Sequence, residues 1–306
     1  MAATDLSDPR GGPRVVSIVI NYHGAEQTRV CVASLLAADY PNHSIVVVDN
    51  ASGELEIDAL RGTLGNAVEI IRAERNLGYG GGANLGLDWA RAAGAAYAWV
   101  LNNDTEVDPL SVRKLVDAME RESDYGIMSP QIDAPIGPEA LDGIWFAGGS
   151  PNLGRALTTH RVVPFVSPGV VEPTDFVTGC AMFLRIRALE DTGLFWEPLF
   201  LYWEDVDLSL RMLGAGWRLG VVPAAHVFHF VHGSIPSKTY RYYNSRNAIL
   251  VAKRHMHGGG AVQATAWVAA RALRTWVQRG GPFPNAEARG LVAGVAAILG
   301  LRRLPR

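Results

Sequence analysis

The chain has 306 residues, of which 48% are hydrophobic and 19% charged, and its formal net charge is −2. This composition is globular and long enough for one large α/β domain with an appended segment. It excludes a membrane span of roughly 20 apolar residues, and the two cysteines, Cys31 and Cys180, indicate neither a disulfide framework nor a metal–cysteine cluster.

Short apolar strands alternate with helical patterns through the first 130 residues. The predicted strands cover residues 15–20, 44–49, 68–71, 97–101 and 125–128, and the predicted helices pass through 31–36 and 83–93 and follow Pro109. This alternation is typical of a mostly parallel sheet with helices on both faces. Ligands bind such sheets beyond the carboxyl ends of the strands, and Asp49 and residues 102–104 lie there.

The second half is predicted to surround the site and to end in helices. Residues 130–173 are rich in Gly and Pro, which indicates loops and short hairpins at an active-site rim. Later elements are expected at 180–186, at a helix from Asp205, at strands 217–222 and 227–228, and at helices 240–255, 262–277 and 286–299. The expected units are a flexible tail (1–14), a catalytic domain (15–237) with nucleotide-binding (15–130) and acceptor (131–237) halves, and a basic helical extension (238–306).

Charge is divided unevenly along the chain. Residues 238–306 contain twelve Lys and Arg and one acid, Glu287, a net charge of +11, while the remainder carries 16 basic and 29 acidic residues, or −13. The asymmetry predicts an anionic partner for the extension, such as lipid headgroups or diphosphates, and no nucleic-acid partner. The simpler alternatives are a basic tail that docks on the acidic body, or a homodimer interface.

A polar turn follows the predicted strand at 97–101. Asn102, Asn103 and Asp104 place one carboxylate and two amides there. A carboxylate in this position can hold a divalent cation that bridges to substrate phosphates. Asn and Asp also occur in turns for purely local reasons, so the turn alone leaves both interpretations open.

A glycine-rich segment, residues 76–84, lies between a predicted strand and a predicted helix. Its backbone can approach a ligand closely, and the helix N-terminus favours phosphate groups. The spacing of Gly78, Gly80 and Ala83 also satisfies the dinucleotide pattern G-x-G-x-x-G/A, so a nicotinamide- or flavin-dependent oxidoreductase is a rival prediction. Against the rival, the segment follows the third predicted strand, where the pattern usually follows the first.

An acidic cluster follows the aromatic run at residues 195–203. Glu204, Asp205 and Asp207 open a predicted helix, where complementarity to the helix dipole is one explanation for them. Carboxylates that emerge from an apolar wall also have raised pKa values and are candidates for a general base. Histidines at 226, 229 and 232 follow at a strand exit, and their regular spacing favours a functional role over simple packing.

In their order along the chain, these motifs resemble family-two, GT-A-fold inverting glycosyltransferases, especially the bacterial rhamnosyltransferase-like branch. The motifs are Val46-Val47-Val48-Asp49-Asn50-Ala51-Ser52, the segment 76–84, Asn102-Asn103-Asp104, Thr178-Gly179-Cys180-Ala181, Trp203-Glu204-Asp205-Val206-Asp207 and Tyr242-Tyr243-Asn244-Ser245-Arg246-Asn247. The resemblance extends from about residue 15 to residue 255. It implies a GT-A fold, which is Rossmann-like and has a mostly parallel central sheet.

The resemblance also implies roles for individual residues. Nucleotide and donor sugar would contact Asn21, Tyr22, Asp49, Asn76, Gly78, Asn84, Asn102, Asn103 and Asp104. Asp205 would be the catalytic base, Glu204 would orient the acceptor or the loop, and Asp207 would be structural. The acceptor or the diphosphate would contact Thr178, Gly179, Trp203, Arg241 and Arg246. Asp104 and His229 would hold Mg²⁺ or Mn²⁺, with Asp104 as the lone carboxylate because Asn102 stands where an aspartate is often found.

The implied reaction moves a sugar, such as rhamnose, from a dTDP- or UDP-sugar to an acceptor hydroxyl in cell-envelope polysaccharide or glycolipid synthesis. A lipid-linked glycan is the expected acceptor, and the enzyme is expected in the cytoplasm, peripheral at the inner face of the plasma membrane through its amphipathic C-terminal helices. A non-catalytic sugar-nucleotide-binding protein is the alternative if Asp104 and Asp205 lie far apart.

Overall fold

The computed structural model describes residues 11–137, 140, 142–166, 169–230, 237–279 and 285–301. The predictions for residues 1–10 and for His232 therefore fall outside the described residues.

The strands are β1 (Val15–Asn21), β2 (His43–Asp49), β3 (Glu69–Arg72), β4 (Tyr97–Asn102), β5 (Thr105–Val107), β6 (Tyr125–Asp133), β7 (Ile144–Phe146), β8 (Gly149–Asn152), β9 (Leu157–His160), β10 (Glu172–Pro173), β11 (Ala181–Arg185) and β12 (Arg218–His229). The helices are α1 (Ala25–Leu36), α2 (Glu54–Leu64), α3 (Gly78–Ala92), α4 (Ser111–Arg121), α5 (Ile186–Thr192), α6 (Glu204–Gly214), α7 (Ser237–His255), α8 (Gly260–Arg279) and α9 (Ala286–Ile298).

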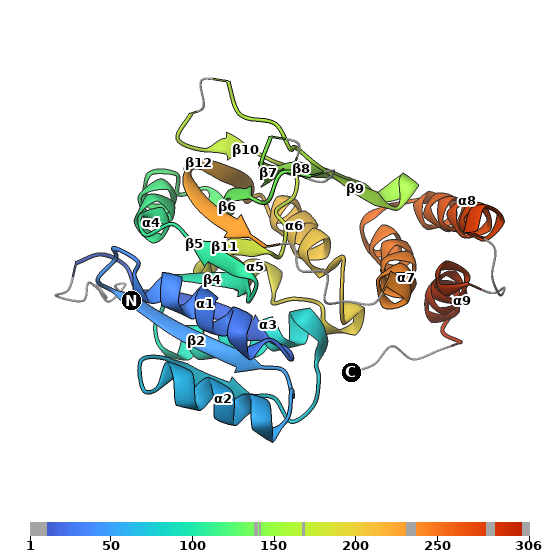
Figure 1. Cartoon of the computed structure of the whole chain (residues 1–306). Coiled ribbons are helices and arrows are strands. Elements are labelled where there is room, and N and C mark those ends of the chain that lie inside the picture. The colour runs from blue at the N-terminus through green and yellow to red at the C-terminus, as the bar shows by residue number, and fades with distance from the viewer. Residues whose placement is uncertain are drawn as a thin grey trace.

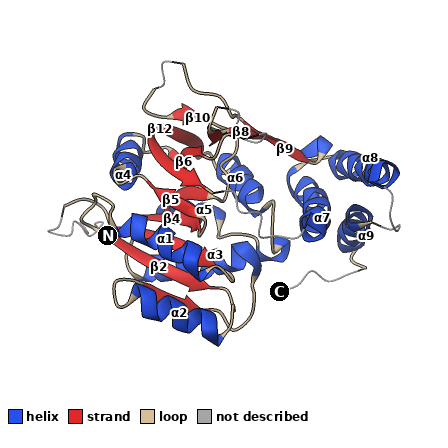
Figure 2. Cartoon of the chain, viewed as in Figure 1, coloured by secondary structure: helices blue, strands red, loops and turns tan. Residues whose placement is uncertain are grey.

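A central sheet organises the molecule, in the strand order β10-β12-β6-β11-β4-β1-β2-β3 (Figures 1 and 2). Strands β3, β2, β1 and β4 pair in parallel, as do β6 and β12, whereas β11 runs antiparallel to both β4 and β6. The predicted α/β class with a mostly parallel sheet is confirmed. The predicted strands at 217–222 and 227–228 are one strand, β12, with an irregular register between Val222 and His226.

Alternate residues of each central strand enter two separate apolar cores. Val15 and Val19 of β1 pack with α1, α2 and α4 on one face, and Val16 and Ile18 pack with α3, α5 and α6 on the other. A strand that is buried on both faces needs apolar residues at nearly every position, since successive side chains point to opposite faces. This requirement explains the continuous apolar runs in the sequence.

The glycine-rich segment is helical from Gly78 onward, so the helix begins five residues before the predicted start at residue 83. Glycine disfavours helix formation, but close packing compensates here. At Gly78, where φ is +74°, a Cβ atom would lie 2.0 Å from the carbonyl oxygen of Phe200. A Cβ on Gly80 would lie 3.1 Å from the Cβ of Phe195. The glycines therefore let the loop at residues 195–203 lie directly on the start of α3.

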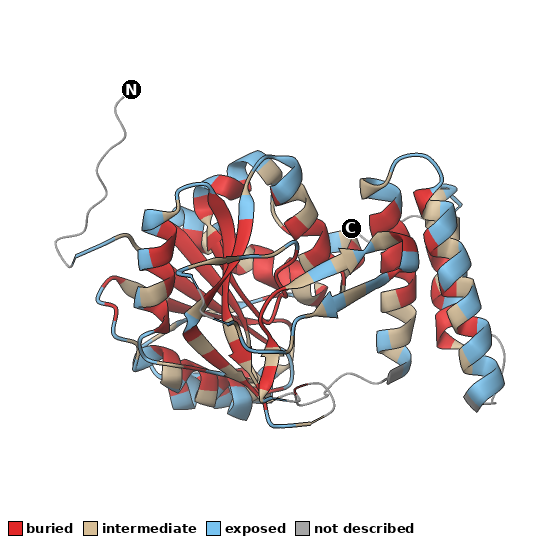
Figure 3. Ribbon diagram, turned by 90° about the horizontal axis from the view of Figure 1, so that it is seen from above, coloured by how far each residue is buried: buried red, intermediate tan, exposed pale blue. Residues whose placement is uncertain are grey.

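The three helices expected in the C-terminal extension are present, and they stack beside the sheet (Figure 1). α9 packs closely on α7 because it presents glycines to it. A Cβ on Gly290 would lie 2.3 Å from the carbonyl oxygen of Tyr242, and one on Gly294 would lie 3.1 Å from that of Arg246. The outward sides of these helices are largely exposed (Figure 3). Within the described residues, no helix has both the length and the apolar character needed to cross a membrane.

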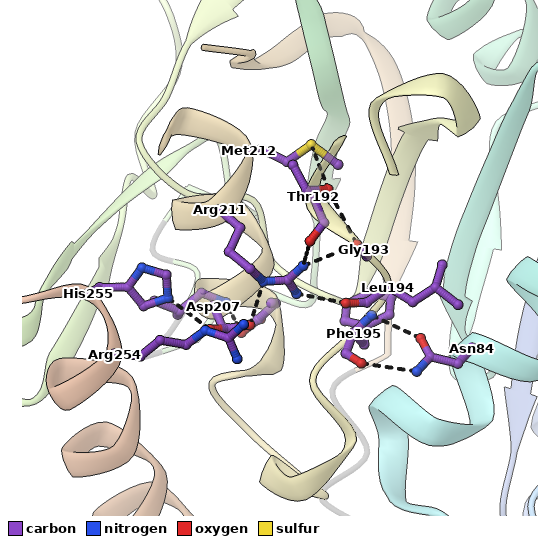
Figure 4. A network of polar contacts seen from close by, with 12 residues as sticks. Asn84, Thr192, Gly193, Leu194, Phe195, Asp207, Arg211, Met212, Arg254 and His255 are labelled. Atoms are coloured by element: carbon purple, nitrogen blue, oxygen red, sulfur yellow. Dashed lines mark hydrogen bonds and ion pairs between the residues drawn. The ribbon is translucent and has the colours of Figure 1, made fainter. Parts of the chain in front are cut away.

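A buried ionic network joins α6 to α7 (Figure 4). Asp207 is fully buried and accepts hydrogen bonds from Arg211 Nε at 2.9 Å and His255 Nε2 at 2.8 Å, and Arg254 Nε lies 3.4 Å away. Burial raises the pKa of Asp207, but these partners outweigh burial and hold it below its usual value. The Arg211 guanidinium also donates to the carbonyl oxygen of Leu194. The network therefore fixes α7 against the base of the 195–203 loop.

Candidate functional site

Three neighbouring parallel strands end in polar side chains at the same edge of the sheet. Asn21 of β1 pairs in register with Asp49 of β2, and its Nδ2 donates to Asp49 Oδ1 at 2.9 Å. The other carboxylate oxygen of Asp49 accepts from Ser52 N at 3.2 Å, and Asp49 is completely buried. Tyr22 lies beside this pair with half of its surface exposed. Asp49 thus orders the edge, and Tyr22 offers an accessible ring there, next to the ring of His23.

The turn after β4 is tied to the first helix. Asn103 Nδ2 donates to the carbonyl oxygen of Gly24 at 3.2 Å and to Thr28 Oγ1 at 3.1 Å, while Thr105 Oγ1 donates to the carbonyl oxygen of Asn102 at 2.7 Å. These bonds leave Asp104 partly accessible at the tip of the turn. Asn102 and Asn103 therefore shape the turn that presents Asp104.

Asp104 faces His229, as the resemblance implies. Asp104 Oδ1 lies 3.2 Å from His229 Nε2, and the backbone N–H of Phe230 donates to the carbonyl oxygen of Asp104. The Nδ1 atom of His229 is buried and has no hydrogen-bond partner in the described part of the chain. Trp145 of β7 packs its ring edge-on against His229, at 4.7 Å between centroids. His226 points elsewhere, because its Nδ1 pairs with Asp133 at 2.9 Å.

Asp205 and Glu204 lie at the first turn of α6. Asp205 Oδ2 accepts from Gly179 N at 3.0 Å and Oδ1 from Val206 N at 2.8 Å. Burial raises the pKa of Asp205, and these backbone hydrogen bonds offset only part of the rise. Glu204 is almost fully buried, its Oε2 has no partner among the described residues, and burial together with the charge of Asp205 raises its pKa well above the usual value.

The two carboxylate groups of the site converge on the start of β11. Asp205 is bonded to Gly179, and the carbonyl oxygen of the adjacent Cys180 accepts a hydrogen bond at 2.9 Å from Asn102 N, in the turn that carries Asp104. Tyr79 donates from its hydroxyl to the carbonyl oxygen of Gly179. Asp205 and the turn that carries Asp104 therefore contact the same two-residue segment. Thr178, also buried, accepts a bond from Cys180 N at 3.4 Å within the same segment.

The backbone before Asp205 is strained. Phe200, Tyr202 and Trp203 have φ values of +65°, +67° and +74°, in the left-handed region that bulky residues avoid. Each such residue costs about 1–3 kcal/mol and persists only when its surroundings hold it there. We call residues 198–203 the base loop, because it sets where α6 and Asp205 begin.

Side chains of α7 hold the base loop from one side. Asn247 Nδ2 lies 2.8 Å from each of three carbonyl oxygens, those of residues 199, 201 and 202. Arg246 Nη2 donates to the carbonyl oxygens of residues 198 and 199 at 2.8 and 2.7 Å. The indole N–H of Trp203 donates to Asn244 Oδ1 at 2.7 Å.

Several residues that were predicted to contact ligands also support this loop. Trp203 is only 4% exposed and packs in the core. Arg246 is equally buried, and its Nε and Nη2 atoms donate to Asn247 and to the base loop. Asn84 uses its amide for Phe195, with bonds of 2.9 and 3.0 Å, and for Glu197. Buried polar groups must be paired, so these hydrogen bonds give the three side chains a structural role, and their predicted ligand contacts stay predictions.

The turn before α3 is supported in the same way. The Asn76 side chain accepts from Gly78 N at 2.8 Å and from Asn50 Nδ2 at 3.2 Å. The side chain of Asn50 also accepts a hydrogen bond from Leu77 N, a role that the sequence analysis did not predict.

Arg241 lies 3.7 Å from Glu287 of α9, and its predicted contact with a diphosphate stays a prediction. Trp145 was missed because residues 130–173 show no periodicity that would place it.

Three features are typical of a group-transfer enzyme: polar side chains at the carboxyl ends of parallel strands, an Asp–His pair, and a buried carboxylate with a raised pKa. Residues 17–142 match the family described as "Glycosyl transferase family 2", and residues 99–283, more than half of the chain, match "Glycosyl transferase family group 2". The chain belongs to this glycosyltransferase family and is a nucleotide-sugar-dependent enzyme. The rival prediction of an oxidoreductase is not favoured.

Individual proteins give the same result. The chain is 29% identical over 259 residues to N-acetylglucosaminyl-diphospho-decaprenol L-rhamnosyltransferase of Mycobacterium tuberculosis, covering 78% of this chain and 84% of that protein. Its fold is similar to that of the mannosyltransferase PcManGT from Pyrobaculum calidifontis in complex with GDP-Man and Mn²⁺ (TM-score 0.58, 18% identity, 97% and 83% coverage). It is also similar to GalNAc-T7 with UDP, GalNAc and Mn²⁺ (TM-score 0.60, 18% identity), covering 79% of this chain and 50% of GalNAc-T7, so it spans about half of that length.

The hydrogen bonds from Asn247 and Arg246 to the base loop, which we call the clamp, generate the first prediction. Replacing Asn247 by Leu removes the donor that three carbonyl oxygens share, so we expect the strained loop to relax and kcat to fall about tenfold or more, as displaced catalytic groups do. Asn42 is the matched control, because it is also buried and donates to a backbone carbonyl, that of Gly12, at the opposite edge of the sheet. Asn42→Leu should lower the free energy of unfolding but not kcat. Equal kcat values for the two variants would contradict the role of the clamp.

Proposed function

We propose that the enzyme transfers its sugar with inversion and that Asp205 is the general base. The acceptor oxygen attacks the anomeric carbon opposite the nucleotide diphosphate, the bond from that carbon to the diphosphate oxygen breaks, and the acceptor proton moves to an Asp205 carboxylate oxygen. The observation that carries this proposal is that Asp205 and the turn of Asp104 both bond to one segment, Asp205 to Gly179 N and Asn102 N to the carbonyl oxygen of Cys180. Glu204, buried next to Asp205, would hold the local geometry in its protonated form.

We further propose that Asp104 and His229 bind Mg²⁺ or Mn²⁺. The two side chains face each other across 3.2 Å. Burial lowers the pKa of His229, but Cys180 and Asp104 outweigh burial and raise it to about 10, so a cation would displace a proton from the imidazole. In the described residues, no group of three His, Cys, Asp or Glu side chains is arranged to hold a metal ion. One carboxylate and one imidazole suit a cation that takes its other ligands from water and diphosphate oxygens. When bound, the cation would offset the charge on the departing diphosphate.

We propose rhamnose from a dTDP- or UDP-sugar as the donor and a lipid-linked glycan of the cell envelope as the acceptor. The support is the similarity to a relative named as a rhamnosyltransferase acting on a diphospho-decaprenol-linked sugar. The accessible Tyr22 ring at the edge of β1 and β2 is where we place the nucleobase, because aromatic rings stack on bases.

The exposed face of α8 is the surface that we propose for binding an anionic membrane at the inner face of the plasma membrane. Val262, Ala266, Leu273 and Val277 are all exposed, and at 3.6 residues per turn they fall within about 60° of one another around the helix. Arg274 flanks them. An apolar stripe beside basic residues is typical of helices that lie in a membrane interface.

The division into domains at residue 237 is likewise a proposal, since the hydrogen bonds from α7 to the base loop cross this boundary.

The base assignment is tested by a pair of nearly isosteric variants. Asp205→Asn should bind the nucleotide normally and lose about 10²–10⁴-fold in kcat, because no carboxylate remains to take the proton. Glu204→Gln should keep most of the activity, because burial and the charge of Asp205 raise the pKa of Glu204 and favour its protonated form, which glutamine resembles in shape. Wild-type kcat/KM should fall as the pH decreases through the raised pKa of Asp205, above the usual ~3.9. An Asp205→Asn enzyme with normal turnover would refute the assignment.

Metal binding is tested without turnover. Mn²⁺ binding to the enzyme in the presence of UDP, followed by electron paramagnetic resonance, should weaken about tenfold or more in Asp104→Asn and in His229→Ala, because a direct ligand should matter at least as much as an outer-shell partner. His226→Ala is the control, since that imidazole pairs with Asp133 away from the site. Unchanged Mn²⁺ affinity in both site variants would remove the proposal.

The membrane proposal is tested by vesicle flotation. Replacing Leu273 and Val277 together by Ser should lower binding to phosphatidylglycerol vesicles about tenfold or more, because both apolar side chains lose their burial in lipid. Leu55→Ser is the control, because Leu55 is even more exposed but lies on α2. Vesicle binding that is the same for all three proteins would exclude the α8 face as the docking surface.

A further inference from the structure

A pocket of about 290 Å³ opens between α7 and α9, outside the edge where the nucleotide is placed. Its lining consists of Lys238, Thr239, Tyr242 and Tyr243 of α7 and Arg289 of α9. Two cations and three hydroxyl groups thus face one space that has no acidic lining residue. Within the described ranges, no carboxylate lies at ion-pair distance from Lys238 or Arg289, and the nearby Glu287 is paired with Arg241.

Close packing of the two helices fixes the shape of this pocket. The backbone of α9 at Gly290 lies directly against the carbonyl oxygen of Tyr242, where a Cβ atom would come within 2.3 Å. Arg289, the neighbour of Gly290, is therefore held beside the tyrosines of α7. A pocket whose walls are set by helix backbones requires little reorganisation on binding, which favours affinity.

One wall of the pocket is also in contact with the base loop. The ring of Tyr243 stacks on Phe200 at 5.2 Å between centroids with an interplanar angle of 25°, and the Arg246 guanidinium lies 4.8 Å from the Tyr243 ring centroid. One turn earlier, Tyr240 packs edge-on against Tyr202 at 4.9 Å. A group held in the pocket would lie beside the loop that leads into Asp205.

We propose that this pocket binds the phosphate or diphosphate of the lipid-linked acceptor, so that the sugar hydroxyl is delivered to Asp205. The proposal rests on the proposed function for its acceptor class. An arginine and a lysine together with hydroxyl donors are the groups that recognise phosphate oxygens. A phospholipid headgroup carries the same chemistry, and the experiment has to separate the two sources.

The test is calorimetric binding of farnesyl diphosphate to the full chain in EDTA, which prevents its capture by a metal ion. Lys238→Gln and Arg289→Gln should each weaken binding about tenfold, the value of one charge-assisted hydrogen bond. Both side chains are exposed, so the fold should be unaffected. Lys253→Gln, on the same helix but outside the pocket, and Arg61→Gln on α2 remove the same charge and should bind as the wild type does.

Two outcomes would overturn the proposal. In the first, both pocket variants bind farnesyl diphosphate as tightly as the wild type does. In the second, the variants lose binding to phosphatidylglycerol vesicles but keep binding to farnesyl diphosphate, which would make the pocket a site for lipid headgroups. Weaker binding of farnesyl diphosphate with unchanged vesicle binding supports the proposal. Because binding requires no turnover, a failure of sugar transfer to lipid-linked acceptors would contradict the proposed function separately.

Discussion

The strained turn before Asp205 is the constraint on which the site depends. Three aromatic residues with positive φ values reverse the chain so that α6 starts with its first carboxylates at the head of β11. Together they cost several kcal/mol, at about 1–3 kcal/mol each. Asn247 and its neighbours on α7 satisfy the carbonyl oxygens of this turn from one side, and Tyr79 N at the start of α3 donates to that of Phe200 from the other. The position of Asp205 is therefore set by two helices that are distant in sequence.

This arrangement makes the C-terminal helices part of the catalytic unit. α7 clamps the base loop, the ionic network around Asp207 holds the same helix to α6, and α9 packs on α7 through glycines. The charge of the extension alone predicts a segment that binds partners. Its first helix, α7, also makes the contacts that keep the strained base loop in place. Deletion of α9 would therefore disturb the site as well as any membrane contact. For this reason, point variants on α8 test membrane binding more directly than a truncation that removes α9.

The sequence was sufficient for those features that depend on local pattern. Continuous apolar strands predicted the doubly covered sheet, and the chemistry at their carboxyl ends predicted the edge that carries Asp49 and Asp104. The glycines at 78 and 80 were ambiguous, because close approach to a ligand and close approach to another loop require the same residue. Asn84, Trp203 and Arg246 could not be assigned, because their partners are distant in sequence. Arg246 meets a backbone carbonyl 48 residues away and Asn84 one that is 111 residues away. Trp203 meets the side chain of Asn244, 41 residues away. Sequence shows that a polar group is present but not which distant carbonyl it meets.

Three carboxylates within four positions show how environment divides their roles. Asp207 is buried among Arg211, Arg254 and His255, so its charge is stabilised and it can serve only as a structural anion. Glu204 is buried without such partners, and a second negative charge beside Asp205 would be costly, so the proton belongs on Glu204. For Asp205, burial raises the pKa and two backbone N–H groups offset part of the rise, so this carboxylate is stabilised less than that of Asp207. A single helical turn thus holds three carboxyl groups in three environments, and the backbone turn that precedes it places Asp205 against Gly179.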